Sequence, residues 1–264
     1  MKKTVLLLSA LCLMVACERN KPAPEQEAFS FNTISVNDSV QFPESSLEEW
    51  HYTDKSYYKC EIDEPVTKNQ ALHDSIVEWI ASQLVDVTTT ESRDIKALME
   101  RDKNSFLTIE DGEPGYESQT FLKLREVADN YVTYVEESYL YLGGAHGMPF
   151  YYCATFNSQT GRRFSYEMFK SFDGLNEMLE DGIIDQYFGE MGEDGFDIDD
   201  VLFVDKDEPF PLPFTMPWIE RDSVHFCYGA YEIAPFVVGM PECSFPYSAM
   251  EKFLTDEGKS FFTK

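Results

Sequence analysis

His146 is the residue in this sequence whose setting best suits chemistry. It lies in the glycine-rich stretch GGAHG at residues 143–147, between two runs rich in aromatic and β-branched side chains. An imidazole can take up or release a proton near neutral pH, and backbone N–H groups of a glycine-rich loop can face a ligand. The alternative is structural: the glycines permit a tight bend, and His146 hydrogen-bonds the loop to a glutamate or to the backbone. We favour the structural interpretation, because no partner nucleophile or metal-ligand spacing accompanies this histidine.

Motifs of the common enzyme classes do not occur elsewhere in the sequence. It contains no G-x-S-x-G, P-loop, H-E-x-x-H or dinucleotide-binding glycine pattern. The acidic stretch EMGEDGFDIDD at residues 190–200 lacks the ligand order and the closing glutamate of a calcium loop. We therefore expect a solvated acidic loop there, no metal and no cofactor. The enzymatic hypothesis that remains is a hydrolase acting through His146 and an acidic partner.

The charge of the chain limits its partners. Its 264 residues have a formal net charge of -27, so the phosphates of a nucleic acid would be repelled. A cationic partner is electrostatically easier, although a solvated acidic surface without a partner is the simpler explanation. Hydrophobic residues make up 43% of the chain, which is enough to form the core of one large domain or two small ones.

The N-terminus resembles a bacterial lipoprotein leader. Two lysines precede an apolar run that is too short for a stable membrane span, and LMVAC at residues 13–17 resembles a lipobox, with Met14 as a departure from the usual residue. We therefore expect a signal peptide at 1–16, a lipid on Cys17 and a flexible tether at 17–28. The body would then be exported and held at the membrane, facing the periplasm or the cell surface. An ordinary secretory signal is the alternative.

Four cysteines remain in the expected body. They are Cys60, Cys153, Cys227 and Cys243, and none belongs to a C-x-x-C pair or a zinc-ligand spacing. An exported protein can form disulfides, and four cysteines admit three pairings. Each cysteine could equally be a small buried apolar residue.

Helices and strands are predicted in separate blocks of the body, which extends over residues 29–264. Strands are expected at 29–42 and at 50–62, the second ending at Asp63-Glu64-Pro65. Residues 67–70, TKNQ, have the form of a capping box before an amphipathic helix that ends near Leu84, and a short helix follows at 92–101. These elements, with the strand at 118–128, form the N-terminal part of the body, 29–128.

The C-terminal part, 129–264, is expected to be richer in strands. Asp173 is the expected cap of its main helix. The expected strands are 131–142, 150–156, 162–164, 201–204, 223–231 and 242–247, with a turn at 157–161, a helical turn at 165–169 and a last helix from Ser248. Segregated helices and meander strands favour an α+β fold.

Three motifs in order resemble the RsiV-like family, domain of unknown function 3298. Residues 141–147, YLGGAHG, match its Y-x-G-G-A-H-G/P signature, and residues 156–169 match the turn and helix that follow in that family. Residues 231–239, YEIAPFVVG, and 245–247, FPY, match its ending. The resemblance spans about residues 50–254. It implies an α+β fold with an antiparallel β-sheet meander, helices packed on one face, and an envelope setting.

The known members of this family point to binding rather than catalysis. They include the lysozyme-binding extracytoplasmic part of an anti-sigma factor and the non-catalytic N-terminal region of a peptidoglycan deacetylase. Co-occurrence of the motifs in the family also suggests that Glu232 pairs with the GGAHG loop. Aromatic residues around these motifs could form a sugar or peptide platform, although core packing is commoner. The candidate ligand-binding residues are Tyr141, Gly144, His146, Tyr231 and Glu232.

Three functional hypotheses follow from the sequence. The favoured one is a lipid-anchored, non-catalytic envelope binding module whose ligand is a cationic protein such as lysozyme, or a peptidoglycan fragment. The second is a hydrolase that uses His146. The third is a structural envelope lipoprotein without a ligand.

Overall fold

The computed structural model describes residues 29–44, 53–84, 93–108, 114–189, 201–204 and 208–262. The expected leader at 1–16, Cys17, the tether at 17–28 and the acidic stretch at 190–200 lie outside the described residues. Among the helices in the described ranges, none is long and apolar enough to cross a membrane.

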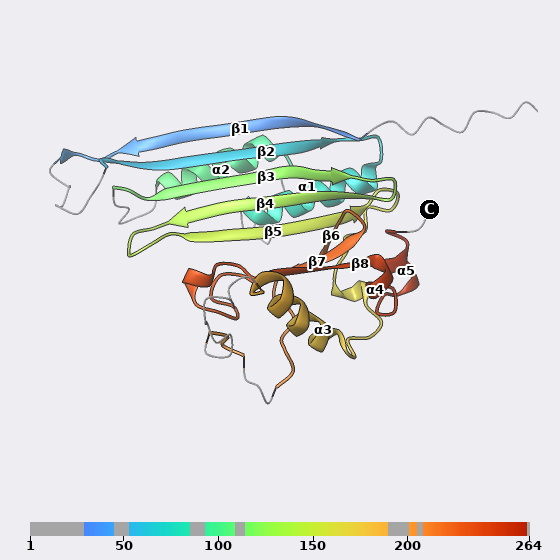
Figure 1. Ribbon diagram of the computed structural model, residues 1–264. Coiled ribbons are helices and arrows are strands. Elements are labelled where there is room, and N and C mark those ends of the chain that lie inside the picture. The colour runs from blue at the N-terminus through green and yellow to red at the C-terminus, as the bar shows by residue number, and fades with distance from the viewer. Residues whose placement is uncertain are drawn as a thin grey trace, which may run out of the picture.

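Five strands form the larger sheet and lie side by side in their order along the chain (Figure 1). Neighbouring strands are antiparallel except for β2 and β3, which run parallel because two helices connect them. The α+β class is therefore confirmed, and the sheet is mixed rather than a pure antiparallel meander. The strands are β1 (Ser30–Gln41), β2 (Lys55–Val66), β3 (Glu117–Val127), β4 (Tyr131–Tyr141) and β5 (Met148–Asn157).

The two connecting helices, α1 (Gln70–Leu84) and α2 (Ile95–Leu107), cover one face of this sheet. Trp79 of α1 packs edge-on against Tyr134 and Phe156, with ring centroids 6.3 and 6.2 Å apart. The cap of α1 differs from the predicted capping box. The side-chain oxygen of Asn69, rather than Thr67, accepts the N–H groups at the start of the helix, including that of Ala71 at 3.1 Å.

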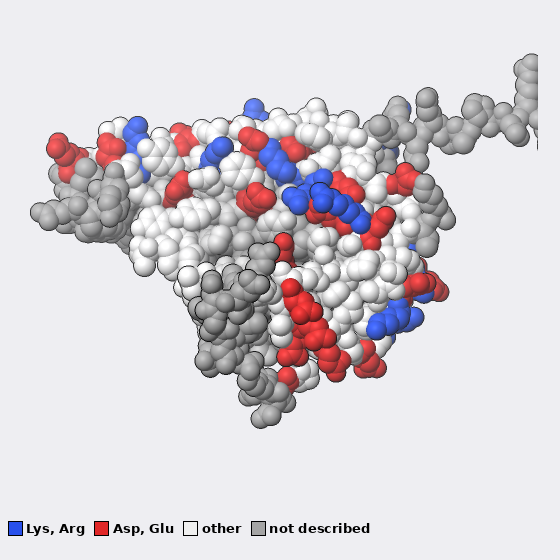
Figure 2. Space-filling view, viewed as in Figure 1, with Lys and Arg blue, Asp and Glu red and all other residues white. Residues whose placement is uncertain are grey.

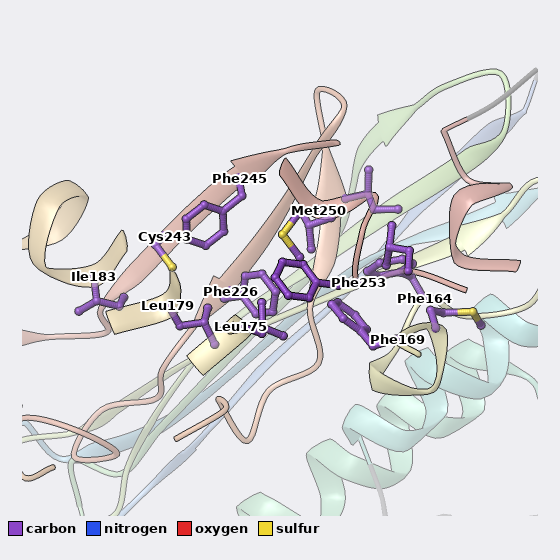
Figure 3. Close-up of a cluster of buried hydrophobic side chains, with 14 of the residues drawn as sticks. Phe164, Phe169, Leu175, Leu179, Ile183, Phe226, Cys243, Phe245, Met250 and Phe253 are labelled. Carbon is purple, nitrogen blue, oxygen red and sulfur yellow. The ribbon is translucent and has the colours of Figure 1, made fainter. Parts of the chain in front are cut away.

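A second unit is built on a three-stranded antiparallel sheet. Side chains from α3, β7, β8 and α4 meet in its core, where Phe226 lies close to Leu175 and Leu179 (Figure 3). Its strands are β6 (Trp218–Glu220), β7 (Ser223–Cys227) and β8 (Glu242–Pro246). Its helices are α3 (Leu175–Gly182), which continues as a π-helical turn (Ile183–Tyr187), α4 (Tyr247–Met250) and α5 (Asp256–Lys259), with 3₁₀ turns at Tyr166–Met168 and Phe236–Val238.

Two buried threonine hydroxyls join the second unit to the larger sheet. Ile219 of β6 donates its N–H to the hydroxyl of Thr155 at 2.8 Å, and its carbonyl oxygen accepts from the hydroxyl of Thr133 at 2.7 Å. Side chains alternate between the faces of a strand, so both threonines lie on the face opposite Tyr134 and Phe156. The second unit therefore packs on the face that α1 and α2 leave uncovered.

Proline placement explains why β2 is longer than predicted. We predict a strand that ends at Asp63-Glu64-Pro65, whereas β2 continues to Val66. β3 pairs with β2 only from Tyr57 to Ile62, so one side of β2 has no neighbouring strand beyond that point. Pro65 can face this side, where its missing N–H removes no ladder hydrogen bond.

Other boundaries in the C-terminal part also differ from the prediction. Residues 201–204 form no strand, and the predicted strand at 223–231 stops at Cys227. Gly174, with φ of 76°, precedes α3 without a side-chain cap, so Asp173 is not the capping residue. Arg163 forms only a single bridge to Phe156. β6 was missed because its three residues follow a proline-rich segment.

The joint between the two units can be tested by replacing Thr155 with valine, which keeps the side-chain shape but removes the hydroxyl. The N–H of Ile219 would lose its partner in a buried position, so we expect the free energy of unfolding to fall by about 1–3 kcal/mol. Urea denaturation measures this change. Thr155→Ser keeps the hydroxyl and should lose less stability. Wild-type stability in Thr155→Val would contradict this role.

Candidate functional site

The β4–β5 hairpin ends in the GGAHG loop, and local geometry explains its glycines. Gly143 and Gly144 have φ of 84° and 92°, in the region that residues with a side chain rarely adopt. Gly147 is needed for another reason, because a Cβ atom there would collide with the ring of Tyr139. The hydroxyl of Tyr141 donates to the carbonyl oxygen of Gly144 at 3.0 Å and closes the bend.

His146 extends from this loop to the segment that follows β7. Its ring stacks on Phe236, with centroids 3.8 Å apart and an angle of 18° between the planes. Nδ1 lies 3.0 Å from the carbonyl oxygen of Gly147, and Nε2 lies 3.2 Å from the hydroxyl of Tyr231. Because a carbonyl oxygen can only accept, Nδ1 carries the proton and Nε2 accepts from the tyrosine. Both ring nitrogens are therefore engaged, and His146 joins the hairpin tip to the second unit.

The YEIAPF segment at residues 231–236 supplies the other half of this contact. Tyr231 has φ of 67°, which is uncommon for a residue with a side chain. The carboxylate of Glu232 accepts the N–H groups of Gly229 at 2.6 Å and Phe214 at 2.7 Å. Burial raises the pKa of Glu232, and these two hydrogen bonds oppose that effect. Glu232 thus fastens two loops of the second unit together, rather than pairing with the GGAHG loop.

A mainly apolar cavity of about 450 Å³ lies between β5 and the loops of the second unit. Met148, Tyr151 and neighbouring residues of β5 form one wall, and Phe214 and Tyr231 lie on the other. Phe214 is 87% exposed and Tyr231 is 47% exposed, and both line the cavity. Val237, which follows Phe236 in the chain, is 89% exposed. We call these three side chains the apolar rim. Exposed apolar groups next to a cavity, as Phe214 and Tyr231 are here, are typical of a binding surface.

The arrangement offers a contact surface and little reaction chemistry. Among the described residues, the hydrogen-bond partners of His146 are a phenol and a carbonyl group, and neither is an activated nucleophile. No cluster of three potential metal ligands occurs in the described part of the chain.

The structure brings some of the predicted site residues together and adds others. His146 contacts Tyr231, whereas Tyr141 and Gly144 contact each other within the loop. Sequence reasoning missed Phe236, although it lies inside the YEIAPF motif. It also missed Phe214, which lies in a proline-rich segment without any periodic pattern.

The four cysteines of the body are free thiols and are buried. Cys153 and Cys227 lie with Trp218 in a small cluster between the two sheets, whereas Cys60 and Cys243 belong to two separate cores. Burial raises the pKa of Cys60, Cys227 and Cys243 to about 12. Thiols in such surroundings are poor nucleophiles, so none of the three adds reactivity to the site.

Comparison with known proteins identifies the fold. No family model and no curated protein matches the sequence. A member of the DUF3298 family from Bacteroides fragilis matches with a TM-score of 0.68 and 15% identity, over 90% of this chain and 99% of that one. A DUF3298 family protein from Pseudomonas aeruginosa matches with a TM-score of 0.60 and 22% identity, over 89% of this chain and 97% of that one. The resemblance predicted from the motifs is thus confirmed at the level of the fold.

The structural role of His146 can be tested by replacing it with alanine. The substitution removes the ring that stacks on Phe236 and both hydrogen bonds, so we expect the free energy of unfolding to fall by about 1–2 kcal/mol. Amide hydrogen exchange should accelerate at residues 143–147 and 231–236 together. The control is His73→Ala, at a half-buried histidine of α1 that contacts its neighbour Asp74. Unchanged exchange in both segments would show that His146 does not join them.

Proposed function

We propose that this chain is a lipid-anchored, non-catalytic binding module of the bacterial cell envelope, and that the apolar rim and its cavity form the ligand surface. The proposal rests on the geometry of His146, which holds the hairpin tip against the YEIAPF segment through both ring nitrogens. A surface fixed in this way loses little conformational freedom when a ligand binds. The solved DUF3298 structures support the fold and name no ligand.

Charge favours a cationic ligand. The chain has a formal net charge of -27, and Figure 2 shows acidic side chains gathered over the part of the second unit where α3 lies. Such a surface attracts a basic protein at low ionic strength. Lysozyme is one concrete partner of this kind, and a peptidoglycan fragment is the alternative ligand.

The N-terminal sequence supports the anchor. A lipid on Cys17 and a tether at 17–28 would hold the body outside the membrane, at a distance of up to about 40 Å when the tether is extended. A hydrolase that uses His146 is not favoured, because the ring nitrogens are engaged by groups that hold the fold together.

The ligand surface can be tested with the double variant Phe214→Ser and Val237→Ser. Both side chains are largely exposed, so the fold should persist while the apolar contact area is lost. We expect binding of lysozyme or of soluble peptidoglycan fragments, measured by calorimetry at low salt, to weaken by about tenfold or more.

The matched control for this test is the double variant Phe31→Ser and Val127→Ser, since those side chains are 44% and 48% exposed on β1 and β3. It should bind like the wild type. Equal weakening in both double variants, or no binding of either probe to the wild type, would refute this version of the proposal.

The anchor requires a separate experiment on the full chain in a bacterial host. Cys17→Ala removes the expected lipidation site, so the protein should leave the membrane fraction. Cys12→Ala, inside the expected leader, should stay with the membrane. If Cys17→Ala remained membrane-bound, the lipid anchor would be wrong, and the proposed ligand surface would be unaffected.

A further inference from the structure

A second cavity, of about 440 Å³, lies on the other face of the larger sheet. It is formed where the C-terminal half of α2 and the last turn of α1 lie over β3, β4 and β5. Its walls combine two carboxylates, Asp102 and Glu136, with the aromatic rings of Phe150 and Tyr152 and with several hydroxyl groups. No lysine or arginine is among the described residues that line it.

Glu136 is the unusual residue of this cavity. It lies in β4 on the face that carries Tyr134, and the residue is only 5% exposed. One carboxylate oxygen accepts the hydroxyl of Ser138 at 2.8 Å, whereas Oε2 is buried without a hydrogen-bond partner among the described residues. A buried carboxylate without a positive partner is costly when it is ionised.

The second carboxylate lies on α2. Asp102 accepts the hydroxyl of Tyr58 at 2.8 Å and is also partly buried. Burial raises the pKa of Asp102 to about 6 and that of Glu136 to about 7. The hydroxyl groups that donate to these carboxylates lower both pKa values, but by less than burial raises them. Both acids line one cavity and ionise with difficulty, so a cation bound beside either carboxylate would stabilise its anionic form.

The remaining walls suit an ammonium group. Phe150 and Tyr152 are stacked, with ring centroids 6.3 Å apart, and aromatic faces attract organic cations. Thr120 and Ser138 are paired neighbours on β3 and β4 and line the same cavity, so their hydroxyls can accept further N–H groups. An ammonium has three N–H donors, and Oε2 of Glu136 offers the missing acceptor.

We propose that this cavity binds a small organic cation through a primary ammonium group, with Glu136 as the charged partner and the Phe150–Tyr152 pair as the aromatic wall. The cation could be a free alkylamine or the end of a lysine side chain, because the recognised group is the same. A divalent metal is disfavoured, since the described residues hold no cluster of three potential ligands. Phe150 and Tyr152 also border the cavity beside the apolar rim, whereas Glu136 lines only this cavity and Phe214 lines only the other. Variants of Glu136 and of Phe214 therefore test the two proposals separately.

Binding should depend on pH, because the amine needs ionised Glu136. The other titratable groups that face this carboxylate or share its cavity are Asp102 of α2, Tyr58 and Cys60 of β2, Tyr139 of β4 and Tyr152 of β5. Burial raises the pKa of Tyr58, Tyr152 and the Cys60 thiol, which stay neutral, so the two carboxylates control the response. Affinity should rise as the pH increases from 5 through 7 to 8.

The same titration affects the stability of the free protein, and its sign can be derived. The pKa of Glu136 is about 7 in the folded protein and about 4.5 when the group is exposed, so the folded state binds more protons between these values. Protonated Glu136 therefore contributes to the free energy of unfolding below about pH 4.5, and this contribution is lost as the pH rises through about 7. Glu136→Gln should therefore raise the melting temperature at pH 8 and have less effect at pH 5.

The test is titration calorimetry of the full body with n-butylammonium at pH 8. We expect a dissociation constant of about 1 mM, ordinary for so small a ligand, and no binding of the neutral isostere n-butanol. Glu136→Gln should weaken amine binding at least about tenfold. Glu137→Gln is the matched control, because the neighbouring carboxylate is exposed and points to the other face of β4.

A capped Gly-Lys-Gly peptide distinguishes the two sources of the ammonium group. If it binds like n-butylammonium, a lysine side chain fits the cavity, and if only the free amine binds, the ligand is a small amine. The proposal is overturned if n-butanol binds equally well, if Glu136→Gln binds like the wild type, or if Glu137→Gln loses binding to the same extent.

Discussion

Two hydroxyl groups take the place of a neighbouring strand at the joint of this fold. Ile219 donates its N–H to Thr155, and the hydroxyl of Thr133 must donate to the carbonyl oxygen of Ile219, since that oxygen can only accept. The hydroxyl of Thr155 is then free to donate to that of Thr133, which lies 2.8 Å away. The result is a closed ring of three hydrogen bonds. It gives partners to the buried N–H and carbonyl groups of Ile219, on the side of β6 that has no neighbouring strand. This ring anchors β6 on the larger sheet, and the contact of His146 with Phe236 and Tyr231 joins the same two units at another place.

That position determines where the candidate site forms. Once β6 is docked across β4 and β5, the loops that follow β7 lie beside the hairpin tip, where His146 reaches Phe236 and Tyr231. The glycines of the loop allow the bend, and the histidine makes the contact between the units. The apolar rim forms because the tip of the β4–β5 hairpin lies next to the loops of the second unit. The GGAHG and YEIAPF residues therefore position the apolar rim, and a ligand would contact the rim rather than His146 itself.

The sequence predicts local features of this fold better than contacts between distant segments. The NSQTG turn at residues 157–161 places a glycine where a positive φ is wanted, and Gly161 has φ of 71°. The strand that contains Glu136 was also predicted, and a carboxylate on the same face as Tyr134 is the sequence signal of the second cavity. The position of Phe214 could not be predicted, because it depends on a hydrogen bond to Glu232 across a loop whose path no local pattern specifies.

We propose that the histidine of the GGAHG loop is a structural link within a binding surface and not a catalytic base. Nitrogen-15 NMR of the imidazole tests it most directly, because the chemical shifts and two-bond couplings report which ring nitrogen carries the proton. We predict that Nδ1 of His146 carries a proton donated to the carbonyl oxygen of Gly147, and that Nε2 accepts from the hydroxyl of Tyr231. A proton on Nε2, or two tautomers in rapid exchange, would contradict it.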